Sequence, residues 1–250
     1  IDSVVTFEYS IPKSQNSFQT KLYKTDAASL NLYWSRLFLI PCVAIFNLLW
    51  AYRPKGVLIS KITNIKKGRY GYSSKTNYNY GNHLAAKHND DYVYNLPFAK
   101  DEKFRVSQGY LGKRTHKNEN ALDFSMPIGT NIYAARDGKV IKVVDTNVKT
   151  CDKIECAKYN NSVLVYHKDG TFSNYLHINT NSAKVKAGDI IEKGQLIAES
   201  GNIGWSSGPH LHFVVFNQQL KERKTLKTKF KVKEEAVFLK EKEKYKRTYD

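Results

Sequence analysis

The chain has 250 residues, 41% hydrophobic and 13% aromatic, which is enough to build one large folded domain or two modest ones and excludes a disordered chain. Forty basic against 23 acidic residues give a net charge of +17. Nucleic acid, anionic lipid and anionic cell-wall polymer are the partners such a charge attracts. A nucleic-acid binder should carry a recognition helix or an aromatic ribonucleoprotein motif, and the sequence has neither, so we expect no nucleic-acid partner.

The first 99 residues are expected to form a β-sandwich-like accessory domain with a connector. Tyrosine and phenylalanine number 17 and 12, and residues of this kind favour strands over a helical bundle. Short apolar runs separated by polar or glycine-containing turns predict strands at residues 4–9, 43–52, 56–62 and 69–74. No potential catalytic groups cluster here, so the predicted role is that of a packing or spacer domain.

The strongest apolar stretch, residues 37–52, does not read as a membrane span. It is shorter than the roughly 20 residues that cross a bilayer. Pro41 and Asn47 interrupt it, and two buried strands or a strand and a turn fit it better. We therefore expect no membrane span within this chain.

Residues 88–98 are expected to form a connector, in which Pro97 favours an extended chain. The spacing of glycines along the sequence changes after it. From residue 100 to 220, frequent glycines separate short runs such as KVIKVV, SVLVYH and HFVVF, which predicts a second domain of short strands with tight turns. Residues 221–250 form a basic extension with 12 basic and six acidic residues, whose end is either a helix or a final strand and tail. The expected fold class is mainly β throughout.

The three cysteines are interpreted differently. Cys151 and Cys156 flank a short polar stretch, and a local disulfide between them would be natural in an oxidising compartment. Zinc ligation by this pair is the weaker alternative, because no second cysteine pair is present. Cys42 lies in the apolar run and is expected to be a buried thiol.

Four histidines and one aspartate of the second half form a pattern typical of a metal site: His116, Asp123, His177, His210 and His212. On a strand, residues two apart point to the same face, so His210 and His212 can face one cleft. His167 precedes an Asp-Gly turn and is expected to be structural. His83 and His88 are assigned no role.

Imidazole and carboxylate groups are zinc ligands, and a catalytic zinc site uses three protein ligands and keeps one position open for water. His116 and Asp123 are close enough in sequence to share one ion, and His212 can supply the third bond. His177 and His210 then remain for catalysis. A neutral imidazole can take a proton from a metal-activated water, and an imidazolium can stabilise the oxyanion of a tetrahedral intermediate.

Residues 104–216 resemble the lysostaphin-like (LytM-type) zinc metallopeptidases, through SQGYLGKRTH, ALDFSMPIGTNIYAARDGKVI, DGTFSNYLHI and VKAGDIIEKGQLIAESGNIGWSSGPHLHF. The resemblance implies a β-sheet cleft fold and hydrolysis of peptide bonds in peptidoglycan. It implies one zinc ion per chain on His116, Asp123 and His212, with His177 and His210 as the catalytic pair.

Two departures from the family pattern concern the substrate rather than the metal. Six residues separate His116 from Asp123 where many members have three, and Ile203 stands where a threonine is usual. The longer loop and YNLPF at residues 94–98 resemble a subset with an immunoglobulin-like N-terminal β-domain. The longer loop leaves the fine substrate preference open, and Ile203 is expected to alter a turn near the cleft.

Two alternative functions remain. A non-catalytic member of the same fold could activate another wall hydrolase, although such regulators resemble the family with ligands missing, whereas all five residues are present here. A peptidase of glycine-rich proteins is the other alternative, and Tyr110, Asn174 and Trp205 could line the path of either substrate or be ordinary packing residues. The expected location is extracytoplasmic, either periplasmic or secreted, because the implied substrate and the predicted disulfide both lie outside the cytoplasm.

Overall fold

The structure is a computed structural model that describes residues 80–81, 86–219 and 222–250 and, as backbone only, the short strands between residues 2 and 79. The chain divides into two compact units, Ile1–His83 and Leu84–Asp250. The domain limits predicted at residues 99 and 220 stay a prediction, because compactness does not show which segment is a unit of function.

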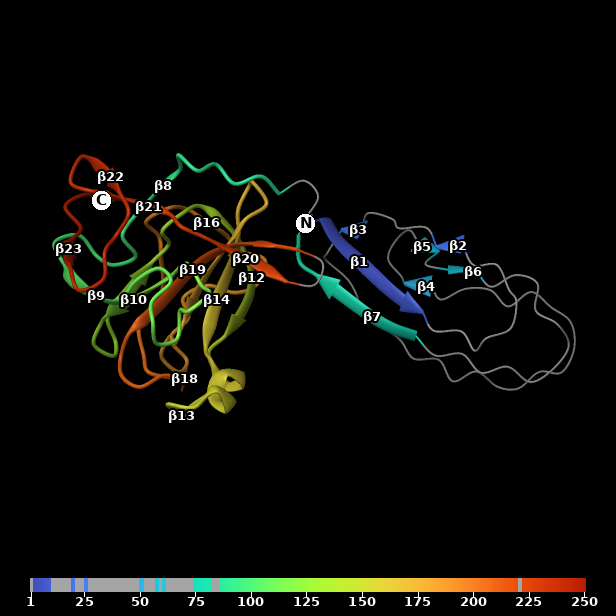
Figure 1. The fold of residues 1–250 in the computed structure, drawn as a ribbon, viewed down its shortest axis with the longest axis horizontal. Helices are drawn as coiled ribbons and strands as arrows, with labels where there is room; N and C mark the ends of the chain where they lie inside the picture. Colours follow the sequence, from blue (N-terminus) through green and yellow to red (C-terminus); the bar gives the residue numbers. More distant parts are fainter. Residues whose placement is uncertain are drawn as a thin grey trace, which may run out of the picture. The chain divides into compact units, whose positions relative to one another are not determined.

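The described part of the first unit is made of strands, drawn in blue to cyan in Figure 1. They are β1 (Asp2–Tyr9), β2 (Gln19–Thr20), β3 (Thr25–Asp26), β4 (Trp50–Ala51), β5 (Val57–Leu58), β6 (Ser60–Lys61) and β7 (Ser74–Asn79). The strand β1 pairs antiparallel with both β3 and β7. The predicted sandwich, the buried thiol of Cys42 and most of the apolar run 37–52 lie outside the described residues.

The second unit contains the remaining strands and a single 3-10 helix, η1, among the residues that the structure describes. The elements are β8 (Val93–Tyr94), β9 (Lys103–Gln108), β10 (Ala121–Ser125), β11 (Asn131–Tyr133), β12 (Gly138–Val144), β13 (Thr150–Cys151), η1 (Ile154–Tyr159), β14 (Ser162–Tyr166), β15 (Phe172–Leu176), β16 (Ile190–Ile191), β17 (Leu196–Glu199), β18 (Gly204–Trp205), β19 (Leu211–Gln218), β20 (Arg223–Leu226), β21 (Lys229–Val232), β22 (Glu235–Val237) and β23 (Lys244–Lys246).

One large sheet organises the second unit. Within the described residues it has nine strands in the order β16-β12-β14-β15-β19-β10-β9-β23, with β20 also paired to β19 (Figure 1). The expectation of a mainly β fold is confirmed. No helix in the described part of the chain is long and apolar enough to cross a membrane.

The central strands separate a core face from a polar face by simple alternation. On β19, Leu211, Phe213 and Val215 belong to the buried core, whereas His212 lies between them in the sequence and so points to the other face. On β10, Leu122 and Phe124 belong to the same core and flank Asp123 in the same way. The apolar residues that fix these two strands therefore also fix the direction of the two polar side chains.

The C-terminal extension completes the sheet. The sequence was compatible with either a helix or a final strand and tail at the end of the extension, and the structure forms strands there. The strand β20 pairs with β19, β23 pairs with β9, and β21 pairs in parallel with β8 of the connector. Residues 222–250 thus pack as part of the second unit rather than as a free tail.

Arg247 ties the connector to this extension. Its side chain is buried, and it donates hydrogen bonds to the carbonyl oxygens of Phe98 at 2.8 Å and of Tyr249 at 3.0 Å. The connector residues Leu96 and Phe98 are fully buried in the core. A buried guanidinium that satisfies several carbonyl groups is costly to remove, because those groups lose their donors while staying away from water.

We predict that Arg247→Met lowers the free energy of opening of the second unit by about 2–4 kcal/mol, because buried carbonyl groups lose their donor. Lys244→Met is the control, since Lys244 lies in the neighbouring strand β23 with an exposed side chain. Hydrogen–deuterium exchange of the β10 amides measures the opening free energy in both variants. Equal protection in the two would show that Arg247 does not hold the connector.

Candidate metal centre

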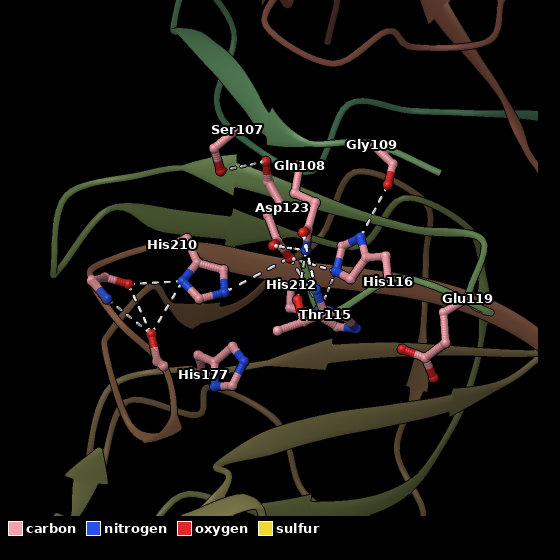
Figure 2. A network of polar contacts seen from close by, with 12 residues as sticks. Ser107, Gln108, Gly109, Thr115, His116, Glu119, Asp123, His177, His210 and His212 are labelled. Carbon is pink, nitrogen blue, oxygen red and sulfur yellow. Dashed lines mark hydrogen bonds and ion pairs between the residues drawn. The ribbon is translucent and has the colours of Figure 1, made fainter. Parts of the chain in front are cut away.

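The five residues predicted from the sequence come together on the polar face of the sheet (Figure 2). Asp123 on β10 stands directly opposite His212 on β19 in the antiparallel register. His116 lies in the loop before β10, His177 directly follows β15, and His210 directly precedes β19. Sheet pairing therefore gathers groups that are up to 96 residues apart in the chain.

Three of these side chains converge on one point. The Nε2 atom of His116 lies 3.1 Å from Nδ1 of His212 and 3.2 Å from Oδ1 of Asp123. The Nδ1 atom of His212 lies 3.0 Å from the same carboxylate oxygen. This trio is the one group of potential metal ligands found in the described part of the chain.

The arrangement fits a metal ion. Two ligands at zinc bond lengths of about 2.0–2.1 Å in a tetrahedral arrangement lie roughly 3.3 Å apart, close to the observed separations of 3.0–3.2 Å. The donors are two imidazoles and one carboxylate, a set used by catalytic zinc sites, which keep a fourth position for water or substrate. The residues present therefore suit a divalent metal.

Neighbouring groups orient the ligand atoms. The Nδ1–H of His116 donates to the carbonyl oxygen of Gly109 at 3.1 Å, which leaves Nε2 with its lone pair toward the centre. The N–H of Gly109 in turn donates to the carboxylate of Glu241, a residue of the C-terminal extension, at 3.2 Å. The Gln108 amide donates to Oδ2 of Asp123 at 3.2 Å, so that Oδ1 is the oxygen that faces the two imidazoles.

The electrostatics of the centre favour an ionised carboxylate. Burial alone would raise the pKa of the Asp123 carboxyl, but hydrogen bonds from His116 and His212 outweigh it and hold that pKa far below its ordinary value. Burial opposes protonation of His116 as well, yet its hydrogen bond with Asp123 raises the pKa of the imidazole above its ordinary value. A metal ion would replace the proton that this network shares without the ion, so binding releases protons.

His177 and His210 lie beside the trio with their rings in contact. The ring centroids are 4.7 Å apart, and the His177 ring is 6.0 Å from that of His212. The Nδ1–H of His177 donates to the Ile203 carbonyl oxygen at 2.7 Å, and that of His210 donates to Gly208 at 2.7 Å. In its neutral form each ring therefore carries the free lone pair on Nε2.

His177 reaches the polar face through an unusual backbone conformation. Its φ is +64°, in the left-handed region that non-glycine residues rarely occupy. Leu176 stands opposite His212 in the ladder, so strict alternation would send the next side chain to the core face. Burial, followed by the nearby imidazoles of His210 and His212, lowers the pKa of His177 to about 3, so the ring is neutral near pH 7.

The other residues considered from the sequence lie elsewhere or have packing partners. His167 is fully buried, and its Nδ1–H donates to the Asp137 carbonyl oxygen at 2.7 Å. The Tyr110 hydroxyl donates to the Thr228 carbonyl oxygen at 2.8 Å, and the Trp205 indole N–H donates to Asp152 at 3.1 Å. His88 contacts Asp90 in the connector, and His83 lies outside the described residues.

Three supporting residues were not assigned roles from the sequence. Gln108 and Gly109 lie in the SQGY segment that carries the family resemblance, and this was the only signal that could have pointed to them. Glu241 offered none, because it is one acidic residue in a lysine-rich run.

Comparison with known proteins places this geometry in a family context. Residues 117–224 match the sequence model of Peptidase family M23; the match begins one residue after His116. A peptidoglycan DD-endopeptidase, ShyA of Vibrio cholerae, is 33% identical over 119 residues, which cover 45% of this chain and 25% of ShyA. An uncharacterized metalloprotease of Buchnera aphidicola is 31% identical over 183 residues, covering 70% of this chain and 44% of that protein.

A third relative is the glycyl-glycine endopeptidase ALE-1 of Staphylococcus capitis, 34% identical over 97 residues, which cover 38% of this chain and 24% of ALE-1. The chain thus spans less than half the length of these curated relatives. The activities in the names of these relatives therefore describe those longer proteins.

We predict that the protein as isolated binds one divalent metal ion per chain and that His212→Ala loses it, because two remaining ligands hold an ion poorly. His167→Gln is the matched control, a buried histidine away from the trio. Metal analysis after gel filtration gives the occupancy of both variants. Full occupancy in His212→Ala would rule out the trio as the site.

Proposed function

We propose that this chain, whose residues 117–224 are a peptidase M23 domain, is a zinc-dependent endopeptidase that hydrolyses peptide bonds in bacterial peptidoglycan. The resemblance to LytM-type peptidases found in the sequence is confirmed for this domain. The observation that carries the proposal is the convergence of His116, Asp123 and His212 beside the contacting rings of His177 and His210.

The metal ligands are proposed to be His116, Asp123 and His212. Mixed nitrogen and oxygen donors with an open position favour zinc over magnesium or calcium, which prefer oxygen ligands. Zinc bound here would supply Lewis acidity, lowering the pKa of a water molecule and polarising the scissile carbonyl.

His177 and His210 are proposed to be the catalytic pair. His177 is neutral near pH 7 and presents Nε2, so it can accept a proton from the attacking water and pass it to the leaving amine. His210 holds Nε2 within 3.7 Å of Asp123 Oδ1, next to the ligand trio. Burial lowers the pKa of the His210 imidazole, so the ring must gain a proton before it can donate a hydrogen bond to the oxygen on which negative charge develops.

Peptidoglycan is proposed as the substrate, and an extracytoplasmic location follows from it. The related proteins ShyA and ShyB of Vibrio cholerae are peptidoglycan DD-endopeptidases, and ALE-1 is a glycyl-glycine endopeptidase. The predicted disulfide between Cys151 and Cys156 is formed in the structure, which suits an oxidising compartment.

A non-catalytic regulator of another wall hydrolase is the main alternative. All three ligands and both neighbouring histidines are present and brought together here, which favours turnover over scaffolding. Adding a chelator separates the two functions, because a scaffold keeps its partner without metal whereas an endopeptidase stops cleaving.

The substrate is tested by incubating the protein with purified wall stem peptides, cross-linked wall fragments and a glycine-rich peptide, and by reading the fragments by mass spectrometry. We expect cleavage of a wall peptide bond that is lost on chelation and restored by zinc. Cleavage of the glycine-rich peptide alone would favour the second alternative, and no cleavage of any substrate would contradict the enzyme.

We predict that His177→Ala and His210→Ala each lower turnover by roughly 10²–10⁴-fold, the usual effect of losing an acid–base or oxyanion group. Zinc occupancy should stay near that of the unmodified protein, because neither residue belongs to the trio. Turnover is measured on the cleaved peptide at saturating substrate. Near-normal turnover in both variants would remove the pair from the mechanism.

We also predict that binding to intact wall sacculi weakens as salt rises, because charge attraction between exposed groups is screened beyond about 10 Å at 0.1 M salt. Replacing the exposed Lys240, Lys242, Lys244 and Lys246 by glutamine should weaken sedimentation with sacculi in the same way. Replacement by arginine is the control, since it keeps the charge.

Cleavage of a short soluble peptide should change little with salt or with these lysines. Sacculus binding that changes neither with salt nor with the lysine substitutions would mean that the basic residues behind the net charge of +17 form only a solvated surface.

A further inference from the structure

The histidine pair depends on one loop, residues 201–208, for its orientation. His177 donates its Nδ1–H to Ile203 and His210 donates to Gly208, both at 2.7 Å. The hydroxyl of Ser206 lies 3.2 Å from Nδ1 of His210 and donates to Asn202 Oδ1 at 2.6 Å. Both rings would lose their acceptors if this loop moved, whereas the metal ligands find their supporting partners elsewhere.

A neighbouring segment, residues 147–160, holds this loop through its backbone. The strands β13 and β18 pair in parallel, with Thr150 opposite Gly204 and Cys151 opposite Trp205 (Figure 1). Gly204 N–H donates to the Lys149 carbonyl oxygen at 2.8 Å, and Ser206 N–H donates to Cys151 at 3.0 Å. Backbone hydrogen bonds to the segment therefore hold this part of the loop in an extended conformation.

The C-terminal end of the segment, at Asn160, also contacts this loop. The Asn160 side-chain oxygen accepts the Trp205 N–H at 2.8 Å. A Cβ on Gly204 would lie 2.0 Å from that oxygen, and the φ of Gly204 is +89°, so only glycine allows this close approach. Residues from both ends of the segment thus meet at β18.

The Cys151–Cys156 disulfide joins the strand β13 to the helix η1 and so closes the segment between its two contacts with the loop. Cys156 is buried at 2% exposure, whereas Ile154 beside it is 57% exposed, so the segment has little apolar core to hold its shape. At its base, Asn161 is fully buried and makes two hydrogen bonds with the backbone of Asn147. The Asn161 carbonyl oxygen accepts the N–H of His177.

We infer that the disulfide-closed segment 147–160 is a positioning element for catalysis, which fixes loop 201–208 and through it the rings of His177 and His210. This inference rests on the proposed function for its effect on turnover. The disulfide acts through the loop and not through the metal, because the supporting contacts of His116 and Asp123 run to Gly109 and Gln108, which belong to neither the loop nor the segment.

Opening the disulfide is predicted to lower kcat about 10–100-fold, since displacing a reacting group by about 1 Å can cost a hundredfold. KM and zinc affinity should change by less than about threefold, a split that general loss of structure would not give. The disulfide is opened either by Cys151→Ser with Cys156→Ser or by a dithiol. The dithiol delivers two electrons and two protons to the sulfur atoms and itself closes to a cyclic disulfide.

The double serine variant is also the control for the reagent. A dithiol binds zinc, so its effect on the unmodified protein is compared with its effect on the variant, where no disulfide remains. We expect a loss of kcat in the unmodified protein and no further loss in the variant at matched zinc content. Where the variant does not fold, the reduced unmodified protein still gives the measurement.

A readout independent of activity decides the positioning itself. In ¹⁵N-histidine-labelled protein, the Nδ1–H signals of His177 and His210 should be sharp with the disulfide closed and should broaden or shift on opening, whereas that of His116 should not. Unchanged signals and unchanged kcat would overturn the inference, and so would joint loss of zinc and all three signals. If these signals respond but the oxidised protein cleaves no wall peptide, the positioning stands and the proposed function fails.

Discussion

The register between β10 and β19 is the constraint on which the site depends. It sets Asp123 directly opposite His212. The core residues that flank these two positions along their strands oppose a shift in register. A shift of either strand by one residue would turn its polar side chain into the core and expose its apolar neighbours, Leu122 on β10 or Phe213 on β19. The geometry of the centre is therefore a consequence of how the apolar faces of two central strands pack, and the loops supply the remaining groups around it.

A second level of organisation determines which nitrogen each ring presents. Carbonyl oxygens of Gly109, Ile203 and Gly208 accept the Nδ1–H of His116, His177 and His210, so that each neutral ring keeps the free lone pair on Nε2. These acceptors come from two separate supports. The C-terminal extension contacts Gly109 through Glu241, and the disulfide-closed segment contacts the loop behind the histidine pair. The proposed metal ligands and the proposed catalytic pair are thus supported by different parts of the unit.

Several features of the fold and of the candidate site were predictable from the sequence, because they depend on residues that are close together in the chain. The alternation of His210 and His212, the mainly β fold and the pairing of Cys151 with Cys156 all rest on neighbours in the chain. The approach of His177 was not predictable from alternation, because it requires a φ of +64°. The support of Gly109 by Glu241 joins residues 132 apart, and no local pattern encodes such a contact.

The central claim is that one metal ion on His116, Asp123 and His212 enables this site to cleave peptides. It is tested most directly by titrating zinc into metal-free protein while turnover of a wall peptide is followed. The account predicts that activity rises linearly from zero and reaches its plateau at one equivalent of zinc per chain. Full activity before any zinc is added, or a plateau that needs two equivalents, would contradict it.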